Sequence, residues 1–180
     1  SRGSGGAQGE QGKQLDDHGV WECILLGGPS SMVRPVPYQR NGVMPQVIVT
    51  RRTHFNAAHR LFNPSWSDAE NARVFGPCAN ANYHGHNYNL DVSVIGEPES
   101  ATGYVIDIKT LQDIVEERVL SRFDHRNLNL DVAEFRDLNP TAEHIVMVCW
   151  RLLAPAIPAG RLHKLVLWET ERNLVEYCGG

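Results

Sequence analysis

The stretch CANANYHGHNYNLDVSVIG at residues 78–96 combines a cysteine, two histidines and an alternating apolar pattern in one short run. From His84 onward, every second residue through Val94 is a histidine or an apolar residue, and most of the residues between them are polar. This period of two predicts a β-strand with one buried face. Both imidazoles therefore lie on the same face of the predicted strand, and Gly85 between them leaves room beside the backbone.

Two histidines at positions i and i+2 of a strand can supply two of the nitrogen ligands that a zinc ion needs. We take His59, at the end of an earlier alternating segment, as the candidate third ligand. The alternative is that His59 lies elsewhere and that His84 and His86 only form hydrogen bonds across a sheet. The residues alone leave both interpretations open.

Composition limits the class of protein. The 180 residues are 42% hydrophobic and 21% charged, as expected for one soluble domain with some additional chain. The net charge is -4, and no basic run is interleaved with aromatic residues, so we expect neither nucleic acid nor a membrane as a partner. The cysteines follow no C-x-x-C spacing, which favours a reducing compartment and a cytoplasmic location. They are Cys23, Cys78, Cys149 and Cys178.

The chain divides into an extension and a domain. Residues 1–43 are rich in Gly, Ser, Gln and Pro, and we expect them to form an N-terminal extension that is largely disordered. The alternating and helical patterns begin after Met44, so the folded domain is predicted to span 44–180.

The pattern of elements predicts an α+β fold. Two long strands come first, separated by a short helix that starts at the capping box Ser67–Glu70. Two amphipathic helices follow, the first capped by Asp107 and the second by Asn139 or Thr141. A closing hairpin gives the order β-β-α-α-β-β, with an antiparallel four-stranded sheet and the helices on one face. The predicted strands are 46–59, 84–97, 162–170 and 174–178, and the two longer helices are 107–123 and about 141–153.

Six motifs in order resemble one enzyme family. They are FNAAHRL at 55–61, FGPCANANYHGHNY at 75–88, ATGYVID at 101–107, FDHRNLNLD at 123–131, NPTAEH at 139–144 and WET at 168–170. Over about residues 46–180 the chain is similar to the 6-pyruvoyl-tetrahydropterin synthases and their bacterial relatives, the 6-carboxy-tetrahydropterin synthases. The resemblance implies the tunnelling fold, or T-fold, in which subunits join their sheets into a barrel. It also implies a homo-oligomer, commonly a hexamer of two trimers, with active sites between subunits.

The resemblance assigns roles to individual residues. It implies that Zn²⁺ is held by His59, His84 and His86, and that Cys78 is the general base. The remaining catalytic residues that it implies are Asp124, His125 and Glu169. Asp124 and His125 would relay protons, and Glu169 would bind the pterin with support from Thr141 and Glu143. Taken as residues alone, Cys78 could be a buried apolar side chain, the Asp-His pair a turn, and Glu169 a solvated strand end.

The implied function is that of a zinc-dependent lyase that converts the small molecule 7,8-dihydroneopterin triphosphate and releases triphosphate. The alternative is the 6-carboxy-tetrahydropterin synthase reaction of queuosine biosynthesis, but the spacing of five residues between Cys78 and His84 favours the pyruvoyl type. A pterin- or metal-binding scaffold without turnover and a pterin aldolase are further alternatives. Two positions depart from the animal-type pattern: Pro77 stands where a lysine is usual, and Tyr83 where a glycine is usual.

Overall fold

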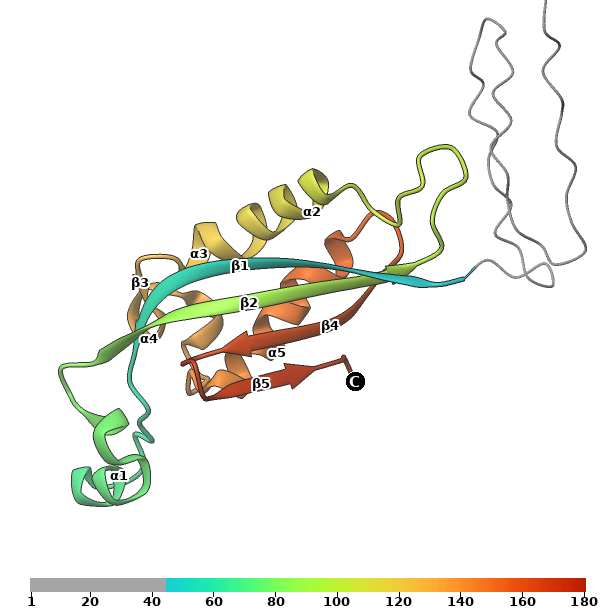
Figure 1. The fold of residues 1–180 in the computed structure, drawn as a ribbon. Helices are drawn as coiled ribbons and strands as arrows, with labels where there is room; N and C mark the ends of the chain where they lie inside the picture. The colour runs from blue at the N-terminus through green and yellow to red at the C-terminus, as the bar shows by residue number, and fades with distance from the viewer. Residues whose placement is uncertain (1–44) are drawn as a thin grey trace, which may run out of the picture. The chain divides into compact units, whose positions relative to one another are not determined.

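Strands β1 (Val47–His59) and β2 (His84–Gly96) form the centre of the computed structural model, which describes residues 45–180 of the chain. They pair antiparallel along their whole lengths, from Val47 opposite Gly96 to His59 opposite His84 (Figure 1). Toward the His59 end, alternate residues of both strands are buried, as the period of two predicted. The expected extension at residues 1–43 lies outside the described residues.

The sheet has five strands in the order β3-β1-β2-β4-β5. Strand β4 (Arg161–Trp168) pairs antiparallel with β2, and β5 (Leu174–Tyr177) pairs antiparallel with β4, which confirms the predicted hairpin. The additional strand is β3 (Arg126–Asn127), which pairs in parallel with Ala57 and Ala58 of β1. The predicted four-stranded antiparallel sheet was therefore one strand short. A strand of two polar residues has no periodicity, and it exists here because the loop packs along β1.

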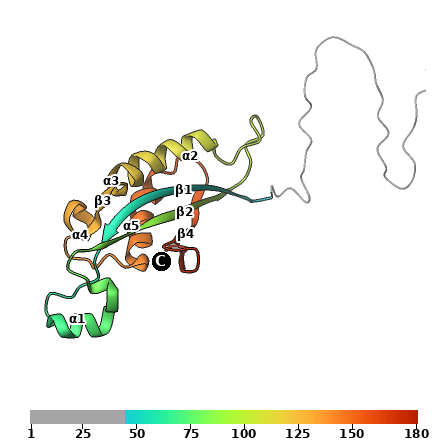
Figure 2. The ribbon, with the colours of Figure 1, turned by 60° about the vertical axis from the view of Figure 1, so that its left-hand side comes forward.

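Helices α2 (Ile108–Val115), α3 (Ser121–Phe123) and α5 (Ala142–Leu153) cover one face of this sheet (Figures 1 and 2). Helix α5 packs on β4 and β5, and helices α2 and α3 pack on β1. The expected caps are confirmed: the side chain of Ser67 accepts from the Glu70 N–H, Asp107 accepts from Lys109 and Thr110, and Thr141 caps α5. The bounds are α1 (Asp68–Phe75), α2 (Ile108–Val115), α3 (Ser121–Phe123), α4 (Leu128–Asp131) and α5 (Ala142–Leu153), with short 3₁₀ turns at Gly76–Ala79, Ala133–Phe135 and Ala154–Ala156.

The helix predicted over 107–123 is continuous but contains a π-helical turn at Glu116–Leu120, between α2 and α3. Leu111, Val115, Val119 and Phe123 are all buried at intervals of four residues. An α-helix has about 3.6 residues per turn, so side chains spaced by four residues rotate progressively around its axis and away from the core. The π-helical turn contains more residues per turn, and it returns the later side chains of this series to the core. Ile108 was expected in this stripe but is 43% exposed. Its side chain belongs to the first turn and points back past the end of the helix.

The connection from β1 to β2 carries α1 and the 3₁₀ turn Gly76–Ala79, which lie beyond one end of the sheet (Figure 1). His59, His84 and the residue after Trp168 all lie at this same end, because β1 and β4 run toward it and β2 starts from it. Strand direction alone therefore gathers the predicted site residues there. Within residues 45–180, no helix has the length and apolar character needed to cross a bilayer.

Candidate active site

The three candidate metal ligands converge. His59 is the last residue of β1, His84 is the first residue of β2 directly opposite, and His86 lies two residues further along the same face. Their ligand nitrogens all lie within 4.8 Å of one another, and the Nε2 atoms of His59 and His84 are 3.0 Å apart. Gly85 keeps the strands close, because a Cβ there would meet the Ala57 carbonyl oxygen at 3.1 Å.

The protonation of these rings suits a metal. The Nδ1 of His59 is 2.8 Å from the Pro140 carbonyl, to which it donates, so its Nε2 carries the lone pair that faces the other rings. His59 is 1% exposed, and burial lowers its pKa to about 4. Burial likewise lowers the pKa of His86, although Glu169 opposes the shift. Three imidazoles at these separations form a donor set that could hold a divalent metal ion.

Glu169 follows β4 directly and brings a carboxylate to the cluster. Its Oε1 is 3.7 Å from the Nε2 of His59 and 3.8 Å from the Nε2 of His86, and its side chain is 22% exposed. A carboxylate at this separation lies beside any ion that the imidazoles hold. It is therefore placed to act on a group bound next to that ion.

Cys78 lies in the 3₁₀ turn Gly76–Ala79, and its thiol is partly buried. Burial and the negative charge of Glu169 both raise the pKa of this thiol. The Leu61 N–H donates to the Cys78 carbonyl at 2.9 Å, so the turn of Cys78 lies beside the chain that leaves β1 after His59. The buried Cys149 occupies a core position of α5, as expected.

Thr141 and Glu143 lie at the start of α5 and line a pocket of about 390 Å³ together with Glu169. The pKa of Glu143 is lowered by its own backbone N–H and then by the Thr141 hydroxyl. The pocket therefore presents an ionised carboxylate close to the histidine cluster. The structure thus brings together the predicted substrate-binding residues.

Asp124 and His125 form a separate pair at the β1 edge of the sheet. The Nδ1 of His125 is 2.8 Å from Asp124 Oδ2, and Asp124 Oδ1 accepts the Asn56 N–H at 2.8 Å. These contacts, chiefly the Asn56 N–H, lower the pKa of Asp124. His125 is 78% exposed and adopts a positive φ of 57°, and its backbone N–H donates to the Asn56 carbonyl.

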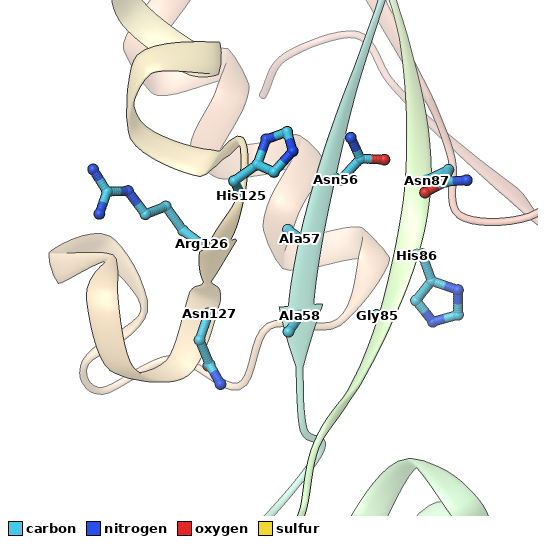
Figure 3. Close-up of a pocket in the computed structure, with 9 residues that line it drawn as sticks. All are labelled: Asn56, Ala57, Ala58, Gly85, His86, Asn87, His125, Arg126 and Asn127. Carbon is cyan, nitrogen blue, oxygen red and sulfur yellow. The ribbon is translucent and has the colours of Figure 1, made fainter.

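The Asp124–His125 pair does not join the histidine cluster within one chain. His125 borders a pocket of about 380 Å³ that Asn56, His86 and Asn127 also line, and the ring of His86 points away from the ring of His125 (Figure 3). The hydrogen bonds of the pair run to each other and to β1, not to Cys78 or Glu169. The predicted site residues therefore form two groups at the same end of the sheet.

Sequence reasoning missed the groups that orient these side chains. The Pro140 carbonyl fixes His59, and both backbone groups of Asn56 hold the Asp124–His125 pair. Such main-chain contacts leave no signal in the residue types, apart from the proximity of Pro140 to Thr141 in the NPTAEH motif.

Comparison with known proteins identifies relatives over the described domain. A family model described as 6-pyruvoyl tetrahydropterin synthase matches residues 48–179. The 6-pyruvoyl tetrahydrobiopterin synthase of Homo sapiens is 42% identical over 134 residues, which cover 74% of this chain and 92% of that protein. The solved structure of Caenorhabditis elegans 6-pyruvoyl tetrahydropterin synthase is 38% identical, with a TM-score of 0.73, and the match covers 76% of this chain and 98% of that one.

Two more distant relatives carry other names. A dihydroneopterin monophosphate aldolase of Pyrococcus furiosus is 33% identical, with 69% of this chain and 91% of that protein covered. A 6-carboxy-5,6,7,8-tetrahydropterin synthase of Rickettsia felis is 26% identical, with 71% and 96% covered. The expected T-fold is confirmed by these likenesses together with the observed α+β architecture.

Proposed function

The chain belongs to the 6-pyruvoyl tetrahydropterin synthase family, and on this premise we propose that it is a zinc-dependent lyase acting on 7,8-dihydroneopterin triphosphate. Triphosphate is released in the proposed reaction. The observation that supports the proposal most strongly is the convergence of three imidazoles and a carboxylate at one end of the sheet, next to the turn that carries Cys78.

His59, His84 and His86 are the proposed zinc ligands, because three imidazole nitrogens within 4.8 Å of one another would serve as the three protein ligands of a catalytic zinc site. When bound, zinc supplies positive charge that polarises the side-chain oxygens of the substrate and favours the thiolate of Cys78. In the absence of zinc, burial and the charge of Glu169 keep the pKa of the Cys78 thiol above its ordinary value. In the zinc-loaded protein, the proposed role of the Cys78 thiolate is to take a proton from the side-chain carbon of the substrate.

We propose that the two carboxylates of the pocket, Glu143 and Glu169, both bind the substrate. Glu169 lies within 4 Å of two ligand nitrogens, so it can reach both the substrate side chain and the pterin edge that enters the pocket. Glu143 is ionised and lies beside Thr141 at the start of α5. In the proposed complex the Glu169 carboxylate accepts two hydrogen bonds from the 2-amino-pyrimidinone edge, much as it would from a guanidinium, and Thr141 and Glu143 support this contact.

Asp124 and His125 are the proposed proton relay, in which the carboxylate fixes the tautomer of the imidazole. Because the pair is separate from Cys78 within one chain, we propose that it serves the site of a neighbouring subunit. Two open edges of the sheet support this: among the described strands, β1 has no partner beside Val47–Asn56 on the side away from β2, and β5 pairs with β4 alone. An antiparallel pairing of β5 with β1 of the next subunit would continue the sheet.

That pairing also brings the two groups of site residues together. Strand β5 starts at Leu174, which lines the pocket of Glu143 and Glu169, and β1 ends near Asn56, which holds the Asp124–His125 pair. In an antiparallel pair the start of β5 lies near the end of β1. We therefore propose a homo-oligomer built on a closed barrel, with a hexamer of two trimers as its full form. We also propose a cytoplasmic location, because Cys78 functions as a free thiol that a reducing compartment maintains.

The test is product analysis on the purified protein loaded with zinc. We expect triphosphate release and a 6-pyruvoyl product by mass spectrometry, loss of activity with a chelator, recovery with added zinc, and almost complete loss in Cys78→Ala. A 6-carboxy product with acetaldehyde would replace the proposed reaction by that of the Rickettsia relative. Cleavage that persists without metal would favour an aldolase, and binding without triphosphate release would show a non-catalytic scaffold.

A further inference from the structure

Within residues 45–180, the chain that leaves β1 after His59 has no strand partner, since the β1–β2 pairing ends at His59 opposite His84. Buried or partly buried backbone groups need partners, and those of the next three residues find them in side chains and in a turn. The Phe62 N–H donates to Asn139 Oδ1 at 3.2 Å, and the Leu61 N–H donates to the Cys78 carbonyl at 2.9 Å. This segment therefore connects β1, which ends at His59, to the turn that carries the thiol of Cys78.

Asn129 takes the place of a strand partner for Arg60. Its Oδ1 accepts the Arg60 N–H at 2.8 Å, and its Nδ2 donates to the Arg60 carbonyl at 3.0 Å, so one carboxamide satisfies both backbone groups of that residue. Asn129 is itself held, because its N–H donates to Asn127 Oδ1 and the Asn127 N–H donates to Asp131 Oδ2 at 2.9 Å. The contact is therefore between two ordered segments.

The side chain of Arg60 extends the connection. Its Nε donates to the Ala79 carbonyl at 2.8 Å, and its guanidinium lies over the ring of Phe62 at 4.1 Å. Consecutive residues, Arg60 and Leu61, thus hold the consecutive carbonyls of Ala79 and Cys78. These bonds fix the position of the 3₁₀ turn relative to His59.

We propose that Asn129 is a positioning residue for the Cys78 thiol and acts on it through Arg60. The carboxamide fixes the main chain of Arg60, whose guanidinium and following N–H fix the turn of Cys78. Asn129 lies in α4, four residues after His125. The same contact therefore also connects the turn of Cys78 to the segment that carries the Asp124–His125 pair. The inference rests on the proposed function for the reactivity of Cys78, and on the described contacts alone for its position.

Two substitutions of Asn129 by residues of similar size test its hydrogen bonds to the main chain of Arg60. Asn129→Leu removes both hydrogen bonds, whereas Asn129→Asp keeps the acceptor for the Arg60 N–H and removes the donor to the carbonyl. We expect kcat to fall about 10- to 100-fold in the leucine variant, and less in the aspartate variant, with KM nearly unchanged, because a misplaced reacting group costs rate and not substrate binding. A rise in KM with unchanged kcat would overturn the proposal.

A labelling measurement gives a readout that does not depend on turnover. In the metal-free protein, iodoacetamide is expected to modify Cys78 faster in Asn129→Leu than in the parent, as measured on its peptide by mass spectrometry. The buried Cys149 should stay protected in both. Labelling of Cys149 that rises in parallel with Cys78 would mean general loss of structure and would overturn the positioning role. If the parent shows no turnover, the proposed function fails while the labelling result still decides this inference.

Arg60→Met provides a second route to the same turn, because it removes the bond to Ala79 and leaves the main chain of Arg60 intact. We expect it to lower kcat and to increase labelling of Cys78, as Asn129→Leu does. If both act through one series of contacts, the double variant should be about as slow as the slower single variant. Losses that multiply in the double variant would show two independent effects and would refute the proposed connection.

Discussion

Two inactive variants are expected to restore each other's activity when they assemble together. Cys78→Ala removes the proposed base, and His125→Ala removes the proposed relay, so each homo-oligomer alone should be inactive. Within one chain, the Asp124–His125 pair is hydrogen-bonded to β1, whereas Cys78 lies in a turn whose carbonyl accepts the Leu61 N–H. If each site combines the thiol of one subunit with the relay of the next, mixed oligomers contain some complete sites.

The expected recovery of activity can be calculated from the proposed arrangement, in which each site combines groups from two subunits. A site is complete when the subunit giving the thiol is the His125→Ala variant and its neighbour giving the relay is the Cys78→Ala variant. With equal amounts and random assembly, each condition holds for half of the subunits, so about one quarter of the sites should be complete. Triphosphate release should then reach about a quarter of the wild-type rate per site.

The variants are unfolded and refolded together, and mixed oligomers are verified by native mass spectrometry before the assay. The matched control mixes Cys78→Ala with the double variant Cys78→Ala/His125→Ala, in which no site can be complete. Confirmed mixed oligomers without activity would refute the reasoning. They would show that the thiol and the relay must belong to the same chain.

Three further measurements test individual groups. Burial lowers the pKa of His59 to about 4 from an ordinary value of 6.5. Between these two pH values, this imidazole is protonated in the unfolded chain and neutral in the folded chain. The stability of the metal-free protein should therefore fall by about 3 kcal/mol as the pH drops through this range, and a denaturant series in His59→Gln should lose most of that slope. Tyr83 has a positive φ of 61°, so Tyr83→Gly should relieve about 1 kcal/mol of strain and raise Tm by about 3 °C; an unchanged or lower Tm would contradict this. Glu169→Gln should raise KM through loss of the hydrogen bonds to the pterin, and Glu143→Gln should raise KM by a smaller factor; a steady-state analysis in which Glu143→Gln has the larger effect on KM would contradict these assignments.

The elements that could be predicted from the sequence are those with a strong local signal. The β1–β2 pair, the hairpin and the capped helices all follow from periodicity and from cap residues such as Ser67 and Asp107. The convergence of His59 with His84 was also predictable. When two consecutive strands pair antiparallel, the end of the first lies beside the start of the second, whatever the length of the connection between them.

What could not be predicted depends on contacts between distant segments. Strand β3 is two polar residues that become a strand only because the loop packs along β1. The separation of His125 from Cys78 depends on which edge of the sheet the loop follows, and the sequence carries no signal for that choice. The π turn was visible only indirectly, as core residues spaced by four from Leu111 to Phe123.

Tyr83 connects the sequence pattern with the backbone. Its position differs from the glycine expected by resemblance, and the structure places it in the left-handed region that a glycine adopts without strain. Tyr83 directly precedes His84, the first proposed metal ligand of β2, so the turn into the strand must keep this conformation for the imidazole to face His59. The substitution therefore changes the conformational cost of the turn and leaves its geometry intact, which explains how a departure from the family pattern can lie next to a proposed metal ligand without displacing it.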